Sequence, residues 1–414
     1  MATRKRGPTK RTQPASADVV PLESRSAGFL SGGAANAAES RFDALVQTGI
    51  RWLRAYDPGH DLIALRRHFG EAVLIELGGN ENPYGPSPEA RAAAEDALYA
   101  LHRYPDPLGG DLKRALAAHH GVDIAQLLLG NGSHELLMQF GQAFAGPGLD
   151  VVASRYGFAV YALATQAAGA TLRLAEAYPR EHPMPRGHDL DAVAATVTPA
   201  TRLVYLANPN NPTGTWFPTA ALDRLLHALP RDILVVVDEA YAEYVTDPAL
   251  PSAVALLSQH PNLIVTRTFS KTYGLAGLRV GYALAHPELV AVMERLRESF
   301  NVNNVGLAAA TAALADQRYT VAVRERNAVD RETLAESLRE RGYFVHPSQT
   351  NFLLVEFGAN TAAIEAALVA RGAVLRPMAG YGLPDCLRIT IGTRDENRRL
   401  LIRLDGIAAE GIGA

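Results

Sequence analysis

The sequence predicts an α/β fold: a large, mostly parallel sheet of the seven-stranded type covered by helices on both faces, beside a smaller α+β domain. Apolar runs of strand length, rich in β-branched residues, alternate with helical segments, which is typical of a parallel sheet buried on both faces. After about Arg295 a long polar helix replaces this alternation. We therefore expect a disordered tail over 1–41, the start of the small domain over 42–80, a large domain over 81–295 and the rest of the small domain over 296–414.

The first forty residues differ in composition from the rest of the chain. They are basic at the start and then rich in Ser, Ala, Gly and Pro. Such a segment buries too little apolar surface to order itself. Its apolar cluster, AGFLSGGAANAA, is too polar for the core of a signal peptide. We expect a disordered extension and, by default, a cytoplasmic protein.

The composition excludes several classes of partner. The chain has 414 residues, 48% of them hydrophobic, and a net charge of only −3, so nothing favours nucleic acid or an anionic membrane electrostatically. No apolar run reaches the length of about eighteen residues that a membrane-spanning helix needs. The single cysteine, Cys386, excludes an intrachain disulfide framework and a cysteine-rich metal site. No carboxylate–histidine cluster supports His134 or the pair 119–120 as metal ligands, and we expect no metal.

The first elements of the body are a helix, a strand and a second helix. RFDALVQTGIRWLRAY (41–56) has helical spacing, and AVLIELGGNENPYGPSP (72–88) indicates a strand followed by a loop. Ser87 is the expected N-cap of the next helix, with Pro88 at its first position. In LLLGNGSHELL a strand leads through a glycine-rich turn into a helix that opens at Ser133.

The middle of the chain supplies most of the predicted sheet. The buried strands are expected in LDVVASR (149–155), ATLRLAE (170–176), TRLVYLANP (201–209), DILVVVDEA (232–240) and NLIVTRTFS (262–270). Segments between them, such as FPTAALDRLLHAL (217–229), have helical spacing. The small domain is expected to begin with a long polar helix over 320–342 and to continue through YFVHPSQTNFLLVEF (343–357).

Polar clusters follow three of these strands, where ligands collect in open α/β sheets. One strand ends in two Asn-Pro turns that include Asn211, and the next ends in Asp238, followed by Tyr241. A third strand ends in a cluster of two hydroxyls, a lysine and an arginine: Thr268, Ser270, Lys271 and Arg279. Each cluster alone fits turn or cap chemistry. Together they place many functional groups on one edge of one sheet.

Lys271 is unusual because nearly all positively charged residues of this chain are arginines. Among 40 lysines and arginines, the lysines are Lys5, Lys10, Lys113 and Lys271. Arginine stays protonated in proteins, whereas an amine loses its proton and becomes a nucleophile. The position therefore favours amine chemistry over charge alone.

Pyridoxal phosphate catalysis uses this set of groups. The cofactor needs a lysine amine for a Schiff base and an acidic partner for its pyridine nitrogen. An amide and a phenol suit its ring hydroxyl, while hydroxyls, an arginine and helix N-terminal N–H groups suit its phosphate. The turn at Gly130–Gly132 offers such N–H groups, and Tyr156 offers an aromatic plate for the ring.

The motifs NPNNPTG, DEAY and FSKTYGLAGLRVGY, in this order, resemble the fold-type I aminotransferases. Four further motifs resemble the histidinol-phosphate branch of that family: LRAYDPGHD, LGGNENPYGPSP, RYPDP and LRPMAGYGLPDCLRITIGT. The resemblance covers roughly Phe42 to Ile407. It implies pyridoxal phosphate as cofactor and transfer of an amino group between L-histidinol phosphate and 2-oxoglutarate, a step of histidine biosynthesis.

The resemblance also implies a role for each matching residue. Lys271 forms the Schiff base and shuttles the proton, and Asp238 pairs with the pyridine nitrogen. Asn211 and Tyr241 contact the ring hydroxyl, and Tyr156 stacks on the ring. The cofactor phosphate is held by the following groups: Thr268, Ser270, Arg279, the backbone at Gly132 and Ser133, and Tyr104 from a second subunit. The pocket for the small-molecule substrates is lined by Tyr56 (also from the partner), Asn82, Arg376 and Arg388. A homodimer with shared sites follows from this implication.

One position near the cofactor phosphate departs from the family pattern. Relatives commonly carry Asp after the Gly-Ser turn, where this chain has His134, so no side-chain role is assigned there.

Two alternatives to histidinol-phosphate transamination stay open. Aromatic amino-acid aminotransferases of the same branch are one, since they accept phenylalanine or tyrosine. A phosphothreonine decarboxylase with the same cofactor machinery is another, and it would release carbon dioxide without an oxo-acid acceptor.

Overall fold

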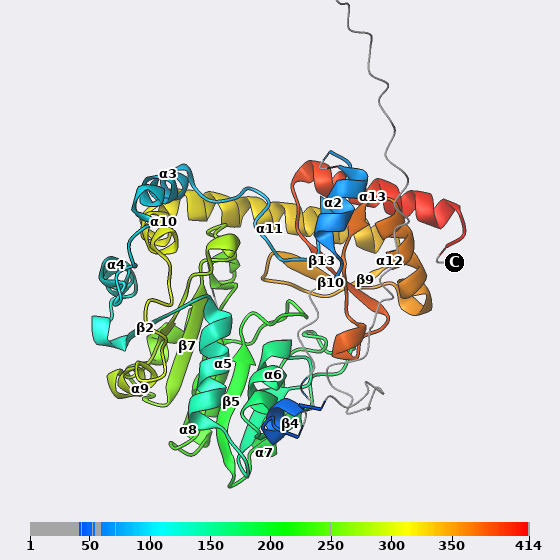
Figure 1. The fold of residues 1–414 in the computed structure, drawn as a ribbon. Coiled ribbons are helices and arrows are strands. Elements are labelled where there is room, and N and C mark those ends of the chain that lie inside the picture. Colours follow the sequence, from blue (N-terminus) through cyan, green and yellow to red (C-terminus); the bar gives the residue numbers. More distant parts are fainter. Residues whose placement is uncertain are drawn as a thin grey trace, which may run out of the picture.

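Two sheet-containing units lie side by side, and a long helix runs between them (Figure 1). The computed structural model describes residues 41–42, 44–51, 53, 59–70, 72–248 and 250–412. The predicted tail, residues 1–41, lies outside these ranges except for Arg41. Within the described part of the chain, no helix is both long and apolar enough to cross a bilayer.

Among the described residues, seven strands form the large sheet, in the order β2-β8-β7-β6-β5-β3-β4. These strands are β2 (Leu127–Gly130), β3 (Asp150–Ser154), β4 (Thr171–Ala175), β5 (Thr201–Ala207), β6 (Leu234–Asp238), β7 (Leu263–Thr268) and β8 (Gly281–Leu284). Strands β4, β3, β5, β6 and β7 pair in parallel, whereas β8 is antiparallel to both β7 and β2. The predicted α/β fold with a mostly parallel sheet is confirmed.

Both faces of the large sheet are buried, because alternate residues of each strand enter two different cores. Val151, Leu203 and Val236 pack on one face with α5 (Ser133–Phe144), α6 (Ala159–Ala167) and α9 (Pro287–Met293). Val152 and Val204 pack on the other face. The helices of that second face are α3 (Pro88–Ala97), α4 (Gly110–His120), α7 (Leu190–Thr196), α8 (Thr219–Ala228) and α10 (Asn304–Ala315). Burial on both sides explains why the strands read as continuous apolar runs.

The smaller unit contains two short sheets. Strand β1 (Ile75–Glu76) pairs in parallel with β11 (Ala373–Val374). A four-stranded sheet has the order β12 (Arg376–Pro377), β13 (Cys386–Thr390), β10 (Phe352–Glu356) and β9 (Phe344–Val345). Its helices are α2 (Leu62–Phe69), α11 (Gln317–Glu340), α12 (Thr361–Ala370) and α13 (Arg394–Ala409). Ile75 and Leu77 share a core with the C-terminal strands, whereas Gly49 lies against the Gln166 carbonyl and Gly169 of the large unit. The four segment boundaries stay a prediction.

Short 3-10 helices occupy several connections. They are η1 (Leu98–Ala100), η2 (Ile124–Gln126), η3 (Ala242–Tyr244), η4 (Ala253–Leu256), η5 (Ala276–Leu278), η6 (Gly358–Asn360) and η7 (Ala379–Tyr381). The predicted start of α3 is confirmed: the Ser87 side chain accepts a hydrogen bond from the Ala90 amide, and Pro88 opens the helix.

Two elements differ from the sequence-based expectation, and the predicted long polar helix has an unexpected buried side. In the predicted helix over 41–56, the described helical residues are those of α1 (Thr48–Arg51). Strand β8 is not among the strands that the sequence predicts, because a short run that begins with Gly281 carries little strand signal. The long helix α11 looks polar in sequence but buries Asn327, Asp330 and Arg331, since it packs against both units.

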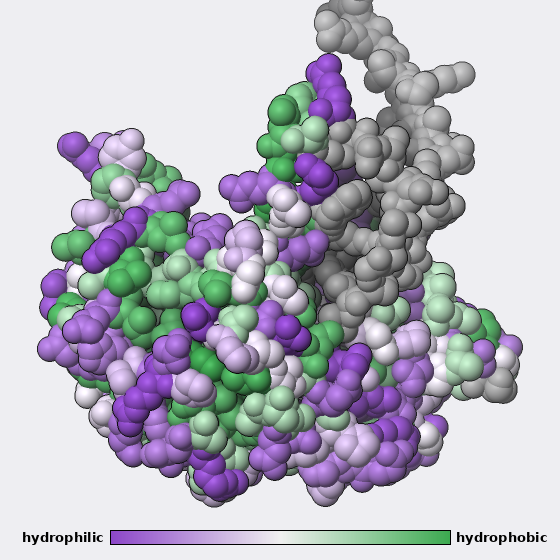
Figure 2. Space-filling model, turned by 90° about the horizontal axis from the view of Figure 1, so that it is seen from below, coloured by the Kyte–Doolittle hydropathy of each residue, from purple (hydrophilic) through white to green (hydrophobic). Residues whose placement is uncertain are grey.

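The surface is mixed in polarity. On the face seen in Figure 2, hydrophilic and hydrophobic residues are interspersed over the large unit. One group of exposed apolar side chains lies close together in sequence, between α3 and α4: Leu98, Tyr99, Leu101, Tyr104 and Leu108.

Candidate active site

Three neighbouring parallel strands bring the predicted polar residues to one edge of the large sheet. Asp238 is the last residue of β6, Thr268 is the last residue of β7, and Asn211 follows the end of β5. Because β5, β6 and β7 are adjacent and parallel, their carboxyl ends lie side by side. This edge is where ligands bind in open α/β sheets.

Asp238 is a buried carboxylate with three hydrogen-bond donors. Its Oδ1 accepts from Thr266 Oγ1 and from the Ala240 amide, both at 3.2 Å, and its Oδ2 accepts from Tyr161 Oη at 3.2 Å. Burial raises the pKa of Asp238 to about 6, against the opposing effect of these hydrogen bonds. At neutral pH the group is therefore an anion in a dry site, suited to pair with a cationic N–H.

Lys271 lies in the loop after β7 and is only partly exposed. Its Nζ donates to the carbonyl of Asn80 at 3.1 Å and lies 5.7 Å from the centre of the Tyr241 ring. Desolvation, followed by the nearby charge of Arg388, lowers the pKa of Lys271 to about 8. A substantial neutral fraction near pH 7.5 gives this amine nucleophilic and basic character.

Asn80 ties these groups together, and the sequence analysis did not select it. Its backbone lies in the left-handed region, with φ 54°, a conformation that Asn tolerates better than most residues. The carbonyl accepts from Lys271, while Nδ2 donates to Tyr241 Oη at 3.0 Å. Tyr241 is buried, and its ring packs edge-on to Phe352. The available signal was an Asn beside a glycine pair, in GGN.

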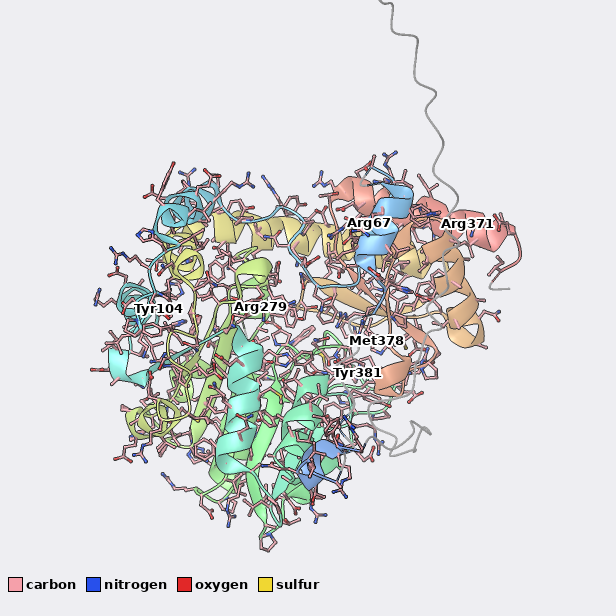
Figure 3. All side chains as sticks on the ribbon, in the orientation of Figure 1. Arg67, Tyr104, Arg279, Arg371, Met378 and Tyr381 are labelled. Atoms are coloured by element: carbon pink, nitrogen blue, oxygen red, sulfur yellow. The ribbon has the colours of Figure 1, made fainter. Side chains whose placement is uncertain are left out.

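Thr268, Ser270 and Arg279 form a connected group of donors. Thr268 Oγ1 lies 3.0 Å from Ser270 Oγ, which accepts from Arg279 Nη1 at 3.1 Å. Arg279 has a left-handed backbone, with φ 55°. Figure 3 shows its side chain near the N-terminal end of α5. Two hydroxyls, a guanidinium and a helix N-terminus together make a site for a phosphate-like anion.

Gly132 completes this anion cradle. It is the N-cap of α5, with φ 81°, and a Cβ built on it would lie 2.3 Å from Arg279 Nη2. The helix begins at Ser133 as predicted, and the close approach of Gly281 to the Ser133 amide fixes the turn against β8. Next to it, burial and then the charge of Arg279 lower the pKa of His134, which favours a neutral imidazole there.

Two of the predicted arginines lie on neighbouring strands of the smaller unit. Arg376 and Arg388 stand directly opposite each other on the paired strands β12 and β13. Arg388 Nη1 donates to Asn211 Oδ1 at 2.6 Å and Nη2 donates to the carbonyl of Gly78 at 2.8 Å. The predicted residues Asn211 and Arg388 are therefore in contact, and the contact joins the two units.

Two other predicted residues have well-defined surroundings. Tyr156 packs against a small apolar cluster that includes Met378 and Tyr381, which Figure 3 shows on the segment between the two units. Asn82 is buried and donates from Nδ2 to the carbonyl of Thr272 at 2.9 Å. The Asn82 side-chain amide thus fixes the backbone directly after Lys271. The sequence alone does not predict this contact.

Tyr104 and Tyr56 are the two residues expected to reach the active site of a second subunit. Tyr104 is 82% exposed, and its ring stacks on Phe300 with ring centres 4.8 Å apart. Figure 3 shows it on the outer flank beside α4, apart from Arg279. Tyr56 lies outside the described residues.

Among the described residues, one group of metal-ligating type is Asp223, His227 and His260. His260 Nε2 lies 2.7 Å from Asp223 Oδ1, and His227 Nδ1 lies 2.9 Å from the Asp223 carbonyl. Hydrogen bonds within the group thus already engage these nitrogen atoms.

Comparison with known proteins places the chain among enzymes of one reaction class. Residues 72–404 match the family model described as "Aminotransferase class I and II". Histidinol-phosphate aminotransferase 2 of Pseudomonas aeruginosa is 45% identical over 372 residues, which cover 89% of this chain and 99% of that protein. A similar relative from Methylococcus capsulatus is 44% identical over 363 residues, covering 88% and 98% of the two chains.

A solved structure shares the fold over nearly its whole length. The crystal structure of histidinol-phosphate aminotransferase from Sinorhizobium meliloti, in complex with pyridoxal-5'-phosphate, matches with a TM-score of 0.77 and 33% identity. The match covers 86% of this chain and 99% of that one. The family model spans most of the chain, and relatives above 40% identity are covered almost completely. The chain belongs to the class I and II aminotransferase family.

Proposed function

We propose that this protein is a pyridoxal-phosphate-dependent transaminase that moves an amino group between L-histidinol phosphate and 2-oxoglutarate, in histidine biosynthesis. The observation that carries the proposal is the placement of the Lys271 amine, the Asp238 carboxylate and the anion cradle on one sheet edge. The names of the relatives and the bound cofactor in the Sinorhizobium meliloti enzyme support it.

The residues present fit pyridoxal phosphate. A side chain at position 132 would fill the space beside Arg279, so the glycine leaves room for a phosphate. Asp238 is buried and its pKa stays below neutrality, which suits a partner for a ring N–H⁺. Thr268, Ser270, Arg279 and the Gly132–Ser133 backbone would hold the phosphate, and Tyr156 would cover the ring.

When bound, the cofactor supplies an electron-withdrawing ring that stabilises charge on the substrate carbon losing its hydrogen. Lys271 Nζ would hold the cofactor until the substrate amine displaces it. The freed amine, in its neutral form, would then take the proton from the substrate carbon and deliver it to the cofactor carbon, and the reverse transfer would serve the second substrate. Asp238 would hold a proton on the pyridine nitrogen. Asn211 and Tyr241 would donate hydrogen bonds to the ring hydroxyl. Asn80 contacts both Tyr241 and Lys271 and so fixes their relative positions.

The two substrates present different anions to one pocket. A phosphate on one and a carboxylate on the other both accept the planar fork of an arginine. Arg376 and Arg388 face each other across β12 and β13, so two such forks are available from the smaller unit. We assign both arginines, with Asn82 and Tyr56, to the substrate pocket.

The same proposal includes a homodimer with shared sites. Tyr104 is highly exposed and stacked on Phe300 beside other exposed apolar residues. An exposed aromatic pair is suited to insertion into a partner. We assign Tyr104 to the cofactor phosphate of the second subunit and Tyr56 to its substrate pocket. The cytoplasmic location remains a prediction.

The decisive experiment combines absorbance with steady-state kinetics of the purified protein. A visible band should appear with bound cofactor and be lost on adding histidinol phosphate. The Lys271→Ala variant should fold normally and lose turnover by at least about a thousandfold, because its base and attachment point are gone. A variant with turnover close to that of the wild type would overturn the assignment.

The choice of substrate is tested in the same assay. Rates with histidinol phosphate should exceed those with phenylalanine, and both should require 2-oxoglutarate. Faster turnover of phenylalanine would identify an aromatic amino-acid aminotransferase instead. Carbon dioxide release from phosphothreonine without an oxo acid would identify a decarboxylase.

A further inference from the structure

Asp238 receives two side-chain hydrogen bonds from elements that the family motifs do not include. Tyr161 lies on α6 and donates to Oδ2 at 3.2 Å, and Thr266 lies on β7 and donates to Oδ1 at 3.2 Å. Both residues are buried, with exposures of 1% and 0%. One side-chain donor on each carboxylate oxygen, together with the Ala240 amide on Oδ1, fixes the rotation of the carboxylate plane.

The Tyr161 hydroxyl is held in one position by its surroundings. The ring stacks in parallel on Tyr205, with centres 4.9 Å apart and planes inclined by 1°, and lies edge-on to Phe158. Tyr205 is anchored in turn, since its hydroxyl donates to the Leu137 carbonyl at 2.7 Å. Tyr205 therefore supports Tyr161, while its own hydroxyl is directed at Leu137 and not at Asp238. The hydroxyl of Tyr161 is thereby aimed at the carboxylate.

The charge state of Asp238 depends on its neighbours. Among the described residues, ionisable groups that act on it include Tyr161, Tyr241 and Lys271. Burial works against its anion, and Tyr161 supplies a neutral donor whose own ionisation is suppressed by burial. Loss of that donor would leave a buried carboxylate with less support, which favours its protonated form.

We propose that Tyr161 is a positioning residue that keeps Asp238 ionised and aimed at the cofactor ring nitrogen. This inference rests on the proposed function. Tyr161 does not touch the substrate; it acts through Asp238, and Thr266 supports the other oxygen. A protonated Asp238 would present an O–H to the ring nitrogen in place of a negative charge, and the electron-withdrawing power of the ring would fall.

The test is the affinity of the cofactor-free protein for pyridoxal phosphate, measured by fluorescence titration from pH 5.5 to 8.5. Comparing each variant with the wild type at the same pH cancels the titration of the cofactor itself. Tyr161→Phe should move the midpoint of the affinity profile upward by about one pH unit, as expected for one hydrogen bond to a charged group. Because the pKa of Asp238 is about 6, its affinity should be about fivefold weaker near pH 6 and equal to the wild type near pH 8.5.

Tyr205→Phe is the matched control, because it removes a buried hydroxyl from the same stacked pair without removing a donor to Asp238. Its affinity ratio to the wild type should be the same at every pH. Equal profiles for Tyr161→Phe and the wild type, or a loss of affinity that does not vary with pH, would overturn the inference. A wild-type protein that binds no pyridoxal phosphate would instead overturn the proposed function.

Discussion

At the scale of single residues, the site depends on groups whose charge is altered by their surroundings. Lys271 has a lowered pKa because burial and Arg388 disfavour its ammonium form. Asp238 has a raised pKa because it is buried. Each pKa shift shows that the charged form of the group is disfavoured in the folded protein, so the cofactor-free site lowers the free energy of unfolding. Such a loss of stability is common at active sites, where pKa values are adjusted for catalysis.

The first prediction concerns the stability of the cofactor-free protein. The folded pKa of Lys271 is about 8, against an ordinary value of 10.5, so the unfolded chain binds this proton more tightly and stability rises with pH between these values. Lys271→Met should therefore stabilise the protein at pH 7 by about 2 kcal/mol. Urea unfolding at pH 7 and pH 10 measures this effect, and the gain should shrink at the higher pH.

Lys113→Met is the matched control for that measurement. Lys113 Nζ lies 2.9 Å from Glu294 Oε1 and forms an ion pair with it. Replacing Lys113 removes this favourable contact, so the Lys113→Met variant should not be more stable than the wild type. A stabilisation of the same size in both variants would indicate a general effect of replacing lysine with an apolar residue. The lowered pKa of Lys271 would then not be the cause.

At the scale of elements, strand ends and one helix start supply the site. The parallel strands β5, β6 and β7 deliver Asn211, Asp238 and Thr268 to the same edge. Helix α5 begins beside Arg279, where its free N–H groups and dipole favour an anion. Gly132 is required at that start, since its backbone is left-handed and no Cβ fits against the guanidinium.

The second prediction tests this helix start. Gly132→Ala should weaken the binding of pyridoxal phosphate to the cofactor-free protein at least tenfold, because the new Cβ displaces Arg279 from the cradle. Gly148→Ala has nearly the same positive φ, 82° against 81°, but nothing lies within 4 Å of its Cβ. Equilibrium dialysis of both variants compares them. Equal losses of affinity would attribute the effect to strain alone.

At the scale of the whole molecule, the site depends on how the two units are joined. Helix α11 runs between them (Figure 1). Arg388 donates to Asn211 of the large unit, and Tyr84 donates to Asp330 of α11 at 3.0 Å. These contacts fix the small-unit arginines relative to Lys271. The exposed pair Tyr104 and Phe300 adds a surface that the proposed second subunit would cover.

The third prediction concerns that surface. Replacing both Tyr104 and Phe300 with Ser should convert the proposed dimer to monomers and lower activity, as measured by analytical ultracentrifugation and turnover. Ile402→Ser on α13, which is also exposed, should leave the dimer intact.

Tyr104→Phe separates assembly from catalysis. It keeps the aromatic stack but loses the hydroxyl, so the dimer should persist while affinity for pyridoxal phosphate falls about fivefold to tenfold. An active wild-type monomer would contradict the shared site.

Much of the fold was predictable because its signals are local. The apolar runs over 149–155, 201–209 and 232–240 contain β3, β5 and β6, and the cap at Ser87 is where the sequence predicts it. Strand β8 was missed because four residues that begin with glycine carry little strand signal alone. It becomes a strand by pairing with β2 and β7 on both sides.

The sequence by itself determined the mostly parallel sheet and the set of polar residues at its carboxyl edge. Strand length, apolar runs and motifs are properties of short contiguous segments, so they can be read without the tertiary structure. Only the tertiary structure decided which side chains support that set. Asn80 meets Tyr241 across 161 positions, and Tyr161 meets Asp238 across 77. Buried polar partners are selected by chain folding rather than by neighbours in sequence, since an unpaired buried group is costly wherever its partner originates.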